Sequence, residues 1–255
     1  MRFFEYIGST AILLVEEIGS LAMFCYRFLF WLVRPPFFFS QLFKQMDFIG
    51  LRSVTVVLLT GAFTGMVSAL QSHHGFSLFG AESLVGSTTA LGLLRELGPV
   101  LASLMVTARA GSAMTAELGT MRVTEQIDAL TVMGVNPFQY LVTPRILATI
   151  VMMPLLTLLF DSIGIAGAYL VGVEFLGIDS GVFMARIVDY VDYEDLFTGL
   201  AKAGCFGLIL SVVGCYKGFG TSGGAEGVGK STTNSVVISS VSILIADYFL
   251  TAIMY

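Results

Sequence analysis

Residues 91–113 read LGLLRELGPVLASLMVTARAGSA, and this stretch decides the fold of the chain. A helix needs about 20 mainly apolar residues to cross a bilayer, and the stretch has that length. Arg95 and Glu96 interrupt its apolar run, and Pro99 predicts a kink or a local break. Neighbouring residues point about 100° apart on a helix, so the two charges do not simply neutralise each other. Each needs a partner or a water-filled cavity, which indicates either a functional pair or a pair that ties helices together.

The composition of the whole chain indicates a membrane protein. Of its 255 residues, 56% are hydrophobic and only 12% are charged, which is about half of the charged share of a soluble domain. The mean hydropathy is +0.86. The net charge is −5 and no basic stripe runs along the sequence, so nothing predicts nucleic-acid binding. We therefore expect an all-α integral membrane protein.

Five stretches, one of which overlaps the one quoted above, are long and apolar enough to span a membrane. They are Leu51–Gln71, Thr88–Arg109, Ile146–Val173, Leu196–Tyr216 and Ser235–Tyr255. Residues 9–33 are also apolar, but Glu16, Glu17 and Arg27 interrupt them, and a charge at the bilayer centre costs about 2.5–3.5 kcal/mol on insertion scales. We expect an N-terminal interfacial or re-entrant helical segment over residues 1–45, its first helix ending at RPP (34–36), and a transmembrane domain over residues 46–255.

Lysine and arginine predict the orientation of the spans, because cytoplasmic loops carry an excess of both. If the N-terminus is cytoplasmic, most basic residues outside the spans fall on the inner side: Arg2, Arg27, Arg34, Lys44, Arg52, Arg122, Arg145, Lys217 and Lys230. The 174–195 loop falls on the outer side, and its only base, Arg186, stands among Glu174, Asp179, Asp189, Asp192, Glu194 and Asp195. We expect a multi-pass protein with a cytoplasmic N-terminus.

Residues 111–135, GSAMTAELGTMRVTEQIDALTVMGV, differ from the spans because they mix apolar and charged side chains. The apolar residues recur at roughly helical spacing, and Thr124 is placed to cap a helix whose first turn is acidic. A helix adsorbed on lipid headgroups is usually rich in Lys and Arg, so the mixture favours a protein partner over a membrane surface. The polar side chains are Glu117, Arg122, Glu125, Gln126 and Asp128.

Two acids inside the spans permit more than one interpretation. Asp161 and Asp247 each lie in an apolar run, where the sequence fits a proton or ion site and also a carboxyl hydrogen-bonded to a neighbouring helix. His73 and His74 are adjacent and cannot chelate a metal from one helical face, and we expect neither a metal site nor catalytic residues. Small residues predict close helix packing at Gly61, Gly65, Gly164, Gly167, Gly204 and Gly207.

The stretch GGAEGVGKST at residues 223–232 matches the phosphate-loop pattern G-x-x-x-x-G-K-[ST] letter for letter. A phosphate loop works because a buried strand delivers its glycines to the start of a helix. Here Gly224 and Lys230 lie between two predicted spans, and no alternating strand–helix pattern can build a sheet. We interpret the stretch as a glycine-rich cytoplasmic turn in which Lys230 follows the positive-inside rule.

These motifs together resemble the permease subunit of Mla-type phospholipid ABC transporters, the MlaE-like family that works with MCE proteins. The resemblance rests on LLRELGPVLASLMVTARAGSAMTAELGTMRVTEQIDAL (93–130) and MGVNPFQYLVTPRILA (133–148). It continues through GIDSGVF (177–183) and GAEGVGKSTTNSVVISS (224–240). It covers roughly residues 45–255, while the N-terminal part is similar only in character.

The resemblance implies a homodimer in a bacterial inner membrane, with cytoplasmic ATPase subunits, a periplasmic MCE hexamer and room for a small STAS-domain protein. It implies that ATP and Mg²⁺ bind the partner ATPase, so no cofactor is expected on this chain. The coupling helix of the family corresponds to Glu117–Met133, with Glu117, Arg122, Glu125 and Asp128 as ATPase contacts. The substrate-cavity candidates are Arg95 and Glu96, which match the family's LLRELGPV, and Lys230, where the family also has a basic residue.

We therefore expect a transport subunit, not an enzyme, that moves phospholipid between the inner membrane and the MCE protein to maintain outer-membrane lipid asymmetry. Two other classes make different predictions. An ion-coupled secondary carrier of a hydrophobic substrate would use Asp161 or Asp247 and would need no ATPase. A membrane ATPase using the Gly224 loop would hydrolyse ATP as the purified chain alone.

Overall fold

The computed structural model describes residues 2–32, 34–35 and 38–254, and every regular element within them is helical. Five helical segments are long and apolar enough to cross a membrane, which confirms the expected all-α fold: Phe39–Ser77, Glu82–Val123, Phe138–Phe175, Tyr193–Phe219 and Gly224–Met254. Two predicted segments include positions outside the described residues: residues 1, 33, 36 and 37 in the N-terminal segment, and Tyr255 at the end of the last span.

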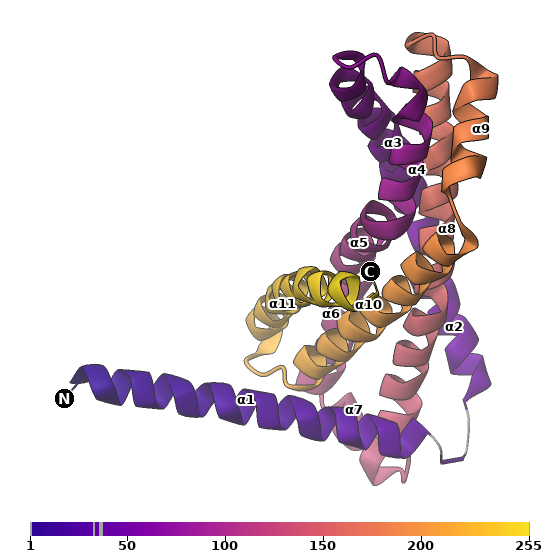
Figure 1. Ribbon diagram of the computed structural model, residues 1–255. Helices are drawn as coiled ribbons and strands as arrows, with labels where there is room; N and C mark the ends of the chain where they lie inside the picture. Colours follow the sequence, from indigo (N-terminus) through magenta and orange to yellow (C-terminus); the bar gives the residue numbers. More distant parts are fainter. Residues whose placement is uncertain (1, 33, 36–37, 255) are drawn as a thin grey trace.

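The helices follow one another with short connections (Figure 1). The first span comprises α2 (Phe39–Ile49), η1 (Leu51–Ser53) and α3 (Val54–Ser77). The second span comprises η2 (Glu82–Leu84), α4 (Val85–Gly92), η3 (Leu93–Leu97), α5 (Gly98–Val106), η4 (Thr107–Gly111) and α6 (Ser112–Val123). After α7 (Gln126–Val132) come η5 (Phe138–Val142), α8 (Thr143–Tyr169), η6 (Leu170–Phe175), α9 (Ser180–Tyr190), α10 (Tyr193–Phe219) and α11 (Gly224–Met254). α7 and α9 lie at opposite ends of the bundle, and we name the two ends after them.

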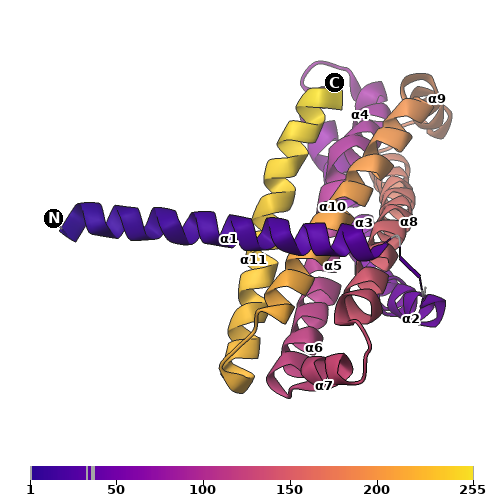
Figure 2. The same ribbon diagram turned by 90° about the horizontal axis from the view of Figure 1, so that it is seen from below.

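The N-terminal helix α1 (Arg2–Leu32) lies across the bundle at the α7 end instead of running along the spans (Figures 1 and 2). Its C-terminal half is anchored by Phe24, whose ring lies 5.1 Å from that of Phe138 and 5.7 Å from that of Tyr216, centroid to centroid. Its N-terminal half extends beyond the other helices. This placement agrees with an interfacial helix that buries aromatic side chains on one face.

Glycines bring α3 and α8 into backbone contact. A Cβ atom added at Gly61 would lie 2.8 Å from the carbonyl oxygen of Phe160, and one added at Gly65 would overlap the carbonyl group of Gly164. The expected close packing is therefore present at these positions. Gly204 differs, since a Cβ there would meet nothing closer than 3.8 Å, which is an ordinary contact.

The second span is not a continuous α-helix. The turns η3 and η4 are wider π-helical turns, and Pro99 is the second residue of α5, directly after η3. Proline has no N–H group and cannot complete the helical hydrogen bond to the carbonyl four residues earlier. The break predicted at Pro99 is thus present, and single π turns of this kind are frequent at functional sites.

The amphipathic segment after this span is two helices, not the single helix expected over Glu117–Met133. α6 continues the span to Val123, and α7 begins after a corner at Thr124 and Glu125. The Thr124 hydroxyl donates to the Thr120 carbonyl at 2.8 Å, so it bonds back into α6 and does not cap α7. Glu125 turns the chain with a left-handed φ of 58°.

The acidic 174–195 loop also contains a helix that the sequence reading did not include. Asp179 caps α9 by accepting from the Val182 N–H at 2.9 Å. Asp192 and Asp195 form a capping box at the start of α10. Three of these acids therefore accept hydrogen bonds from N–H groups that have no partner within their own helix. Negative charge at a helix start is also favoured by the helix dipole.

Replacing Gly65 by alanine should destabilise the protein, because the added Cβ would overlap the Gly164 backbone. Overpacking of this kind costs about 1–3 kcal/mol and should lower the thermal unfolding midpoint of the purified protein. Gly75→Ala is the matched control in the same helix, since nothing lies within 4 Å of its added Cβ and alanine favours the helix. Equal midpoints for the two variants would contradict the backbone contact between α3 and α8.

Candidate functional site

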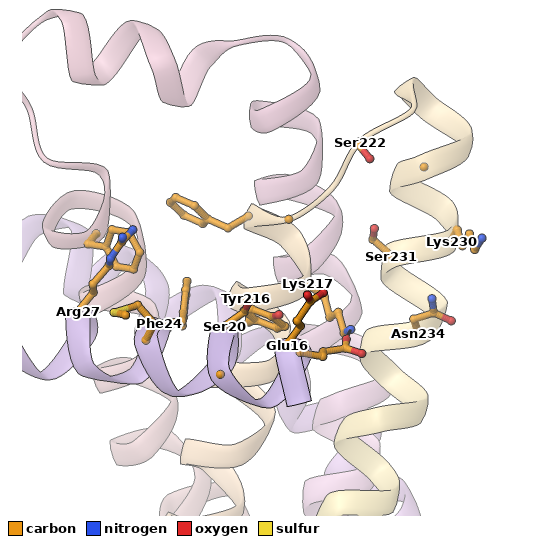
Figure 3. Close-up of a pocket in the computed structure, with 17 residues that line it drawn as sticks. Glu16, Ser20, Phe24, Arg27, Tyr216, Lys217, Ser222, Lys230, Ser231 and Asn234 are labelled. Atoms are coloured by element: carbon orange, nitrogen blue, oxygen red, sulfur yellow. Dashed lines mark hydrogen bonds and ion pairs between the residues drawn. The ribbon is translucent and has the colours of Figure 1, made fainter. Parts of the chain in front are cut away.

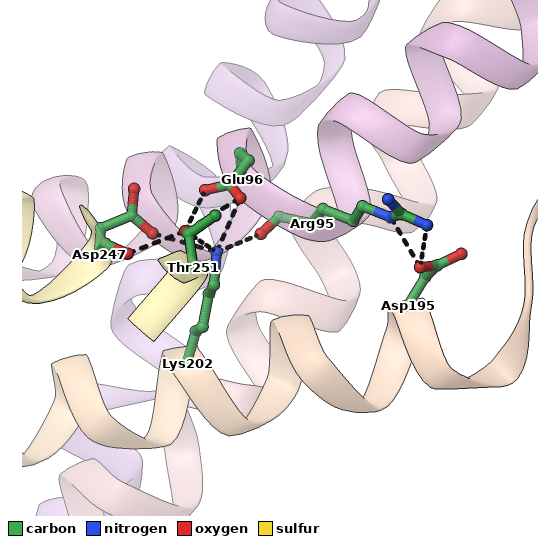
Figure 4. Close-up of polar contacts among 6 residues, drawn as sticks. All are labelled: Arg95, Glu96, Asp195, Lys202, Asp247 and Thr251. Carbon is green, nitrogen blue, oxygen red and sulfur yellow. Dashed lines mark hydrogen bonds and ion pairs between the residues drawn. The ribbon is translucent and has the colours of Figure 1, made fainter. Parts of the chain in front are cut away.

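Five charged side chains gather inside the bundle where η3, α10 and α11 meet (Figure 4). Two are the adjacent residues of the opening stretch, and both have partners on another helix. The Arg95 guanidinium donates to the Asp195 carboxylate through Nη2 at 2.6 Å and Nε at 2.7 Å. Glu96 accepts from the Lys202 ammonium at 2.9 Å. The pair therefore ties η3 to α10, and Asp247 of α11 completes the group.

The Lys202 ammonium is the centre of this ionic cluster. Its side chain is 0% exposed. Besides Glu96, it donates to the Thr251 hydroxyl at 2.7 Å and to the Arg95 backbone carbonyl at 3.0 Å, and Asp247 Oδ1 lies 3.4 Å away. An ammonium has three donors and these bonds use all of them, as a buried cation requires.

Pro99 explains why a backbone carbonyl takes part in the cluster. The Arg95 carbonyl would accept from residue 99 in an α-helix, but Pro99 has no N–H to give. The Lys202 ammonium takes that place. Gly199, one turn earlier on α10, allows the approach, because a Cβ there would overlap the Leu94 carbonyl oxygen.

Asp195 and Lys202 are spaced along α10 so that each meets one of the two side chains, Arg95 and Glu96, that point in different directions from η3. Asp195 and Lys202 are seven residues apart, which is about two helical turns and therefore the same face. Because Arg95 and Glu96 point in different directions from η3, each reaches one of these two groups. Asp195 has a second role, since its Oδ2 atom accepts from the Asp192 N–H at 3.1 Å in the capping box.

The sequence reading missed Lys202, Asp195 and Thr251 as members of the cluster. A signal for Lys202 was present, because it is an ionisable residue in an apolar span, the feature that singled out Asp161 and Asp247. Asp195 was assigned to the acidic loop, although its seven-residue spacing to Lys202 places both on one helical face. Nothing in the sequence marks Thr251, whose role depends on how α11 packs.

Asp161 lies outside this cluster. It is a buried residue of α8, 2% exposed, and its Oδ1 atom has no hydrogen-bond partner among the described residues. This atom sits against Gly98, where an added Cβ would overlap it. A small residue at position 98 is therefore required by the carboxyl group, and an ion or proton role for Asp161 stays a prediction.

A cavity of about 1140 Å³ lies at the α7 end between α1, the end of α10 and the start of α11 (Figure 3). Its walls combine aromatic side chains with charged ones, and Lys217 pairs with Glu17 across the gap. Lys230 belongs to the α11 wall, but its side chain extends away from α1, whereas Ser231 faces the space. The charged residues of the lining are Glu16, Glu17, Arg27, Lys217 and Lys230.

The three substrate-cavity candidates do not lie together. Lys230 and Asp247 share helix α11 and are seventeen residues apart, which corresponds to about 25 Å along a helix. Arg95 and Glu96 belong to the ionic cluster beside Asp247, while Lys230 is at the cavity. One headgroup cannot contact both places at once, and contact of any of the three with a substrate stays a prediction.

The four expected coupling residues also have different surroundings. Glu117 faces the bundle and binds Arg145 of α8, with Oε2 and Nη2 2.9 Å apart and the Arg145 side chain 3% exposed. Arg122 and Asp128 bind each other at 2.6 Å and so fasten α6 to α7 across the corner. Glu125 is exposed at the corner itself.

The stretch from Gly223 to Thr232 does not have the geometry of a phosphate loop. Helix α10 precedes it, and α11 begins at Gly224, so Lys230 and Ser231 lie within a helix. No strand leads into it in the described part of the chain. The rejection of a phosphate loop agrees with this geometry, but the turn itself is shorter than expected: α11 begins at Gly224, eleven residues before the span predicted from Ser235.

Comparison with known proteins identifies the family. A family model described as Permease MlaE matches residues 42–253. A Rickettsia bellii protein named probable ABC transporter permease protein is 46% identical over 98% of this chain and 96% of its own length. The intermembrane phospholipid transport system permease protein MlaE of Haemophilus influenzae is 37% identical over 100% and 98%. The chloroplastic protein TRIGALACTOSYLDIACYLGLYCEROL 1 of Arabidopsis thaliana is 40% identical over 83% and 61%. With a match that covers most of its length, the chain belongs to the MlaE permease family.

Proposed function

We propose that this chain is the permease subunit of an ABC transporter that moves phospholipid between a bacterial inner membrane and a periplasmic MCE protein. The observation that carries the proposal is its membership of the MlaE family, together with full-length similarity to a relative named for intermembrane phospholipid transport. The five spans supply the membrane domain. ATP and Mg²⁺ bind to a separate ATPase subunit, which hydrolyses the ATP, and the chain itself does no covalent chemistry.

The corner between α6 and α7 is the surface we propose for the ATPase. Val132 is 89% exposed and Met133 is 68% exposed at the C-terminal end of α7, and Glu125 is exposed at the start of the same short helix. Large apolar side chains that project singly from a charged rim are typical anchors for a protein partner. The α7 end is then cytoplasmic, which Arg27 of α1, Lys217 near the end of α10 and Lys230 near the start of α11 support.

Two ion pairs support transmission of ATPase movement into the spans. The Arg122–Asp128 pair fastens α7 to α6. The Glu117–Arg145 pair fastens α6 to α8. The Arg145 guanidinium is buried and also donates to the Leu141 carbonyl at 2.9 Å, so it is held in one orientation. A displacement of the corner therefore moves α6 and α8 together.

The cavity beneath α1 is suited to a ligand larger than most metabolites. Its volume of about 1140 Å³ exceeds the roughly 300–1,000 Å³ of ordinary small-molecule pockets. Phe24, Phe138 and Phe219 offer apolar walls, and Arg27 offers a guanidinium suited to a phosphate. This combination supports a phospholipid that enters near the cytoplasmic surface.

A second copy of the chain and the MCE hexamer are the remaining proposed partners, with a STAS-domain protein as an optional one. Support for a second copy comes from α11, in which only 11% of the most apolar stretch is buried. Its exposed side chains form an apolar groove of Val241, Leu244, Ile245, Tyr248 and Phe249. Support for an outer partner comes from exposed apolar side chains at the α9 end: Leu78, Phe79, Phe175 and Val188.

Reconstitution tests the function directly. Proteoliposomes that contain this chain and its ATPase should transfer phospholipid to a soluble MCE acceptor only when ATP is present. Lys230→Ala should leave ATP hydrolysis by the complex unchanged, because Lys230 lies in a helix and not in a phosphate loop. ATP hydrolysis by the purified permease alone, or lipid transfer without the ATPase, would favour one of the other two classes.

Binding of the ATPase should depend on the exposed side chains at the two ends of α7. Val132→Asp combined with Glu125→Arg should release the ATPase from the complex purified through a tag on the permease, because it places repulsive charge at the proposed anchor. Val188→Asp is the matched control, since Val188 is similarly exposed but lies at the α9 end. Retention of the ATPase by the corner variant would show that it docks elsewhere.

The Glu117–Arg145 pair should be required for coupling and not for ATPase binding. Glu117→Arg leaves two cations facing each other, with the buried Arg145 guanidinium deprived of its carboxylate, so it should destabilise the contact between α6 and α8. The exchange Glu117→Arg with Arg145→Glu should restore both stability and lipid transfer. The ATPase should remain bound throughout. Loss of ATPase binding in the exchanged variant would instead make Glu117 a direct contact.

A further inference from the structure

The ionic cluster contains more acid than base. Its charged members come from three elements that pack together: Arg95 and Glu96 from η3, Asp195 and Lys202 from α10, and Asp247 from α11. Arg95 and Asp195 form one neutral pair. Lys202 is then the single cation that faces two acids, Glu96 and Asp247. With all five groups ionised, the cluster has a net charge of −1.

The adjoining helix α8 does not supply the missing positive charge. The charged residue that α8 places against the start of α5 is Asp161, at Gly98, and it is a further acid. The surplus negative charge is therefore shared by Glu96 and Asp247. Both lie within spans, where an unpaired charge at the bilayer centre costs about 2.5–3.5 kcal/mol.

The two carboxyl groups face the same ammonium. Glu96 Oε1 lies 2.9 Å and Asp247 Oδ1 lies 3.4 Å from the same Lys202 nitrogen, so both acids are held at one cation. Asp247 Oδ1 has no hydrogen-bond partner of its own among the described residues, and the Lys202 ammonium is 3.4 Å from it. Ionised carboxylates have only acceptor oxygens, so two of them cannot form a hydrogen bond with each other. A hydrogen bond between them requires one added proton.

We propose that the Glu96–Lys202–Asp247 triad binds one proton, held between the two carboxyl groups. The proton converts one carboxylate into a carboxylic acid whose O–H donates to the other carboxylate. Lys202 keeps its bonds to Glu96, Thr251 and the Arg95 carbonyl. No covalent bond other than O–H forms, and the cluster becomes electrically neutral. This site is independent of which substrate the protein transports.

Proton occupancy controls how firmly the last span is held. Asp247 is on α11, whereas Glu96 is on η3 of the second span. Release of the proton leaves two carboxylates face to face with one ammonium between them, and their repulsion favours separation of α11 from η3. Binding of the proton restores the hydrogen bond across the same contact. The junction is thus a proton-dependent link between two spans.

Infrared spectroscopy of the purified full-length protein at neutral pH tests the proposal, because a protonated carboxyl has its own C=O stretching band. Asp247→Asn should remove one protonated carboxyl, since Glu96 and Lys202 then form a neutral pair. Glu96→Gln should do the same through Asp247 and Lys202. Lys202→Met should add one, because both acids then lack a cation. Asp189→Asn, an exposed acid of α9, should change nothing.

Both amide variants keep the size of the side chain, so a folding failure in one leaves the other as the test. Any signal from the buried Asp161 is identified with Asp161→Asn and subtracted. An unchanged band in either properly folded amide variant would overturn the proposal. So would an unchanged band in Lys202→Met, because charge balance would then not set the number of protons in the cluster.

Discussion

The structure depends on one constraint, which is that the Lys202 ammonium has no access to water and must find all its partners inside the protein. It finds them on two elements besides its own helix: the Glu96 carboxylate and the Arg95 carbonyl on η3, and the Thr251 hydroxyl and the nearby Asp247 carboxyl on α11. The second, fourth and fifth spans therefore meet at one nitrogen atom. Pro99, which frees the carbonyl, and Gly199, which lets α10 approach it, are both explained by that requirement.

The spans could be predicted from the sequence because the thickness of a bilayer fixes the length and composition of a helix that crosses it. The need of Arg95 and Glu96 for partners could also be predicted, because an unpaired charge within a membrane span is costly. Their actual partners could not, because the register between η3 and α10 is a tertiary property. The start of a helix after Thr124 could be predicted from its acidic first turn, but the left-handed corner at Glu125 could not, because a left-handed glutamate is uncommon. The capping bond itself was wrong, because the Thr124 hydroxyl bonds back into α6.

One segment joins the candidate docking corner to the ionic cluster. From Leu93 to Val123 the second span runs from η3 to α6, interrupted only by the π turn η4. Its neighbours pack against it through close backbone contacts; a Cβ at Gly218 of α10, for example, would lie 2.7 Å from the Leu118 Cβ. Packing this tight transmits displacement as movement of whole helices. The π turns are the places where such a helix changes its hydrogen-bonding pattern, so they divide the span into a part that follows α7 and a part that holds the cluster.

The electrostatics of the cluster bear on the path of an anionic headgroup. Lys202 is enclosed, whereas the side chains of Arg95 and Glu96 are each 38% exposed and that of Asp247 is 20% exposed. A phosphate that reaches this level from the α11 side therefore meets carboxyl groups before it meets the ammonium, and two ionised carboxylates would repel it. Neutralising the triad with one proton removes that repulsion without breaking the bonds of Lys202. The resemblance to a family groups Arg95, Glu96 and Lys230 as one cavity, but distance separates them: Lys230 lines the cavity at the α7 end, whereas Arg95 and Glu96 belong to the ionic cluster near the other end of α11.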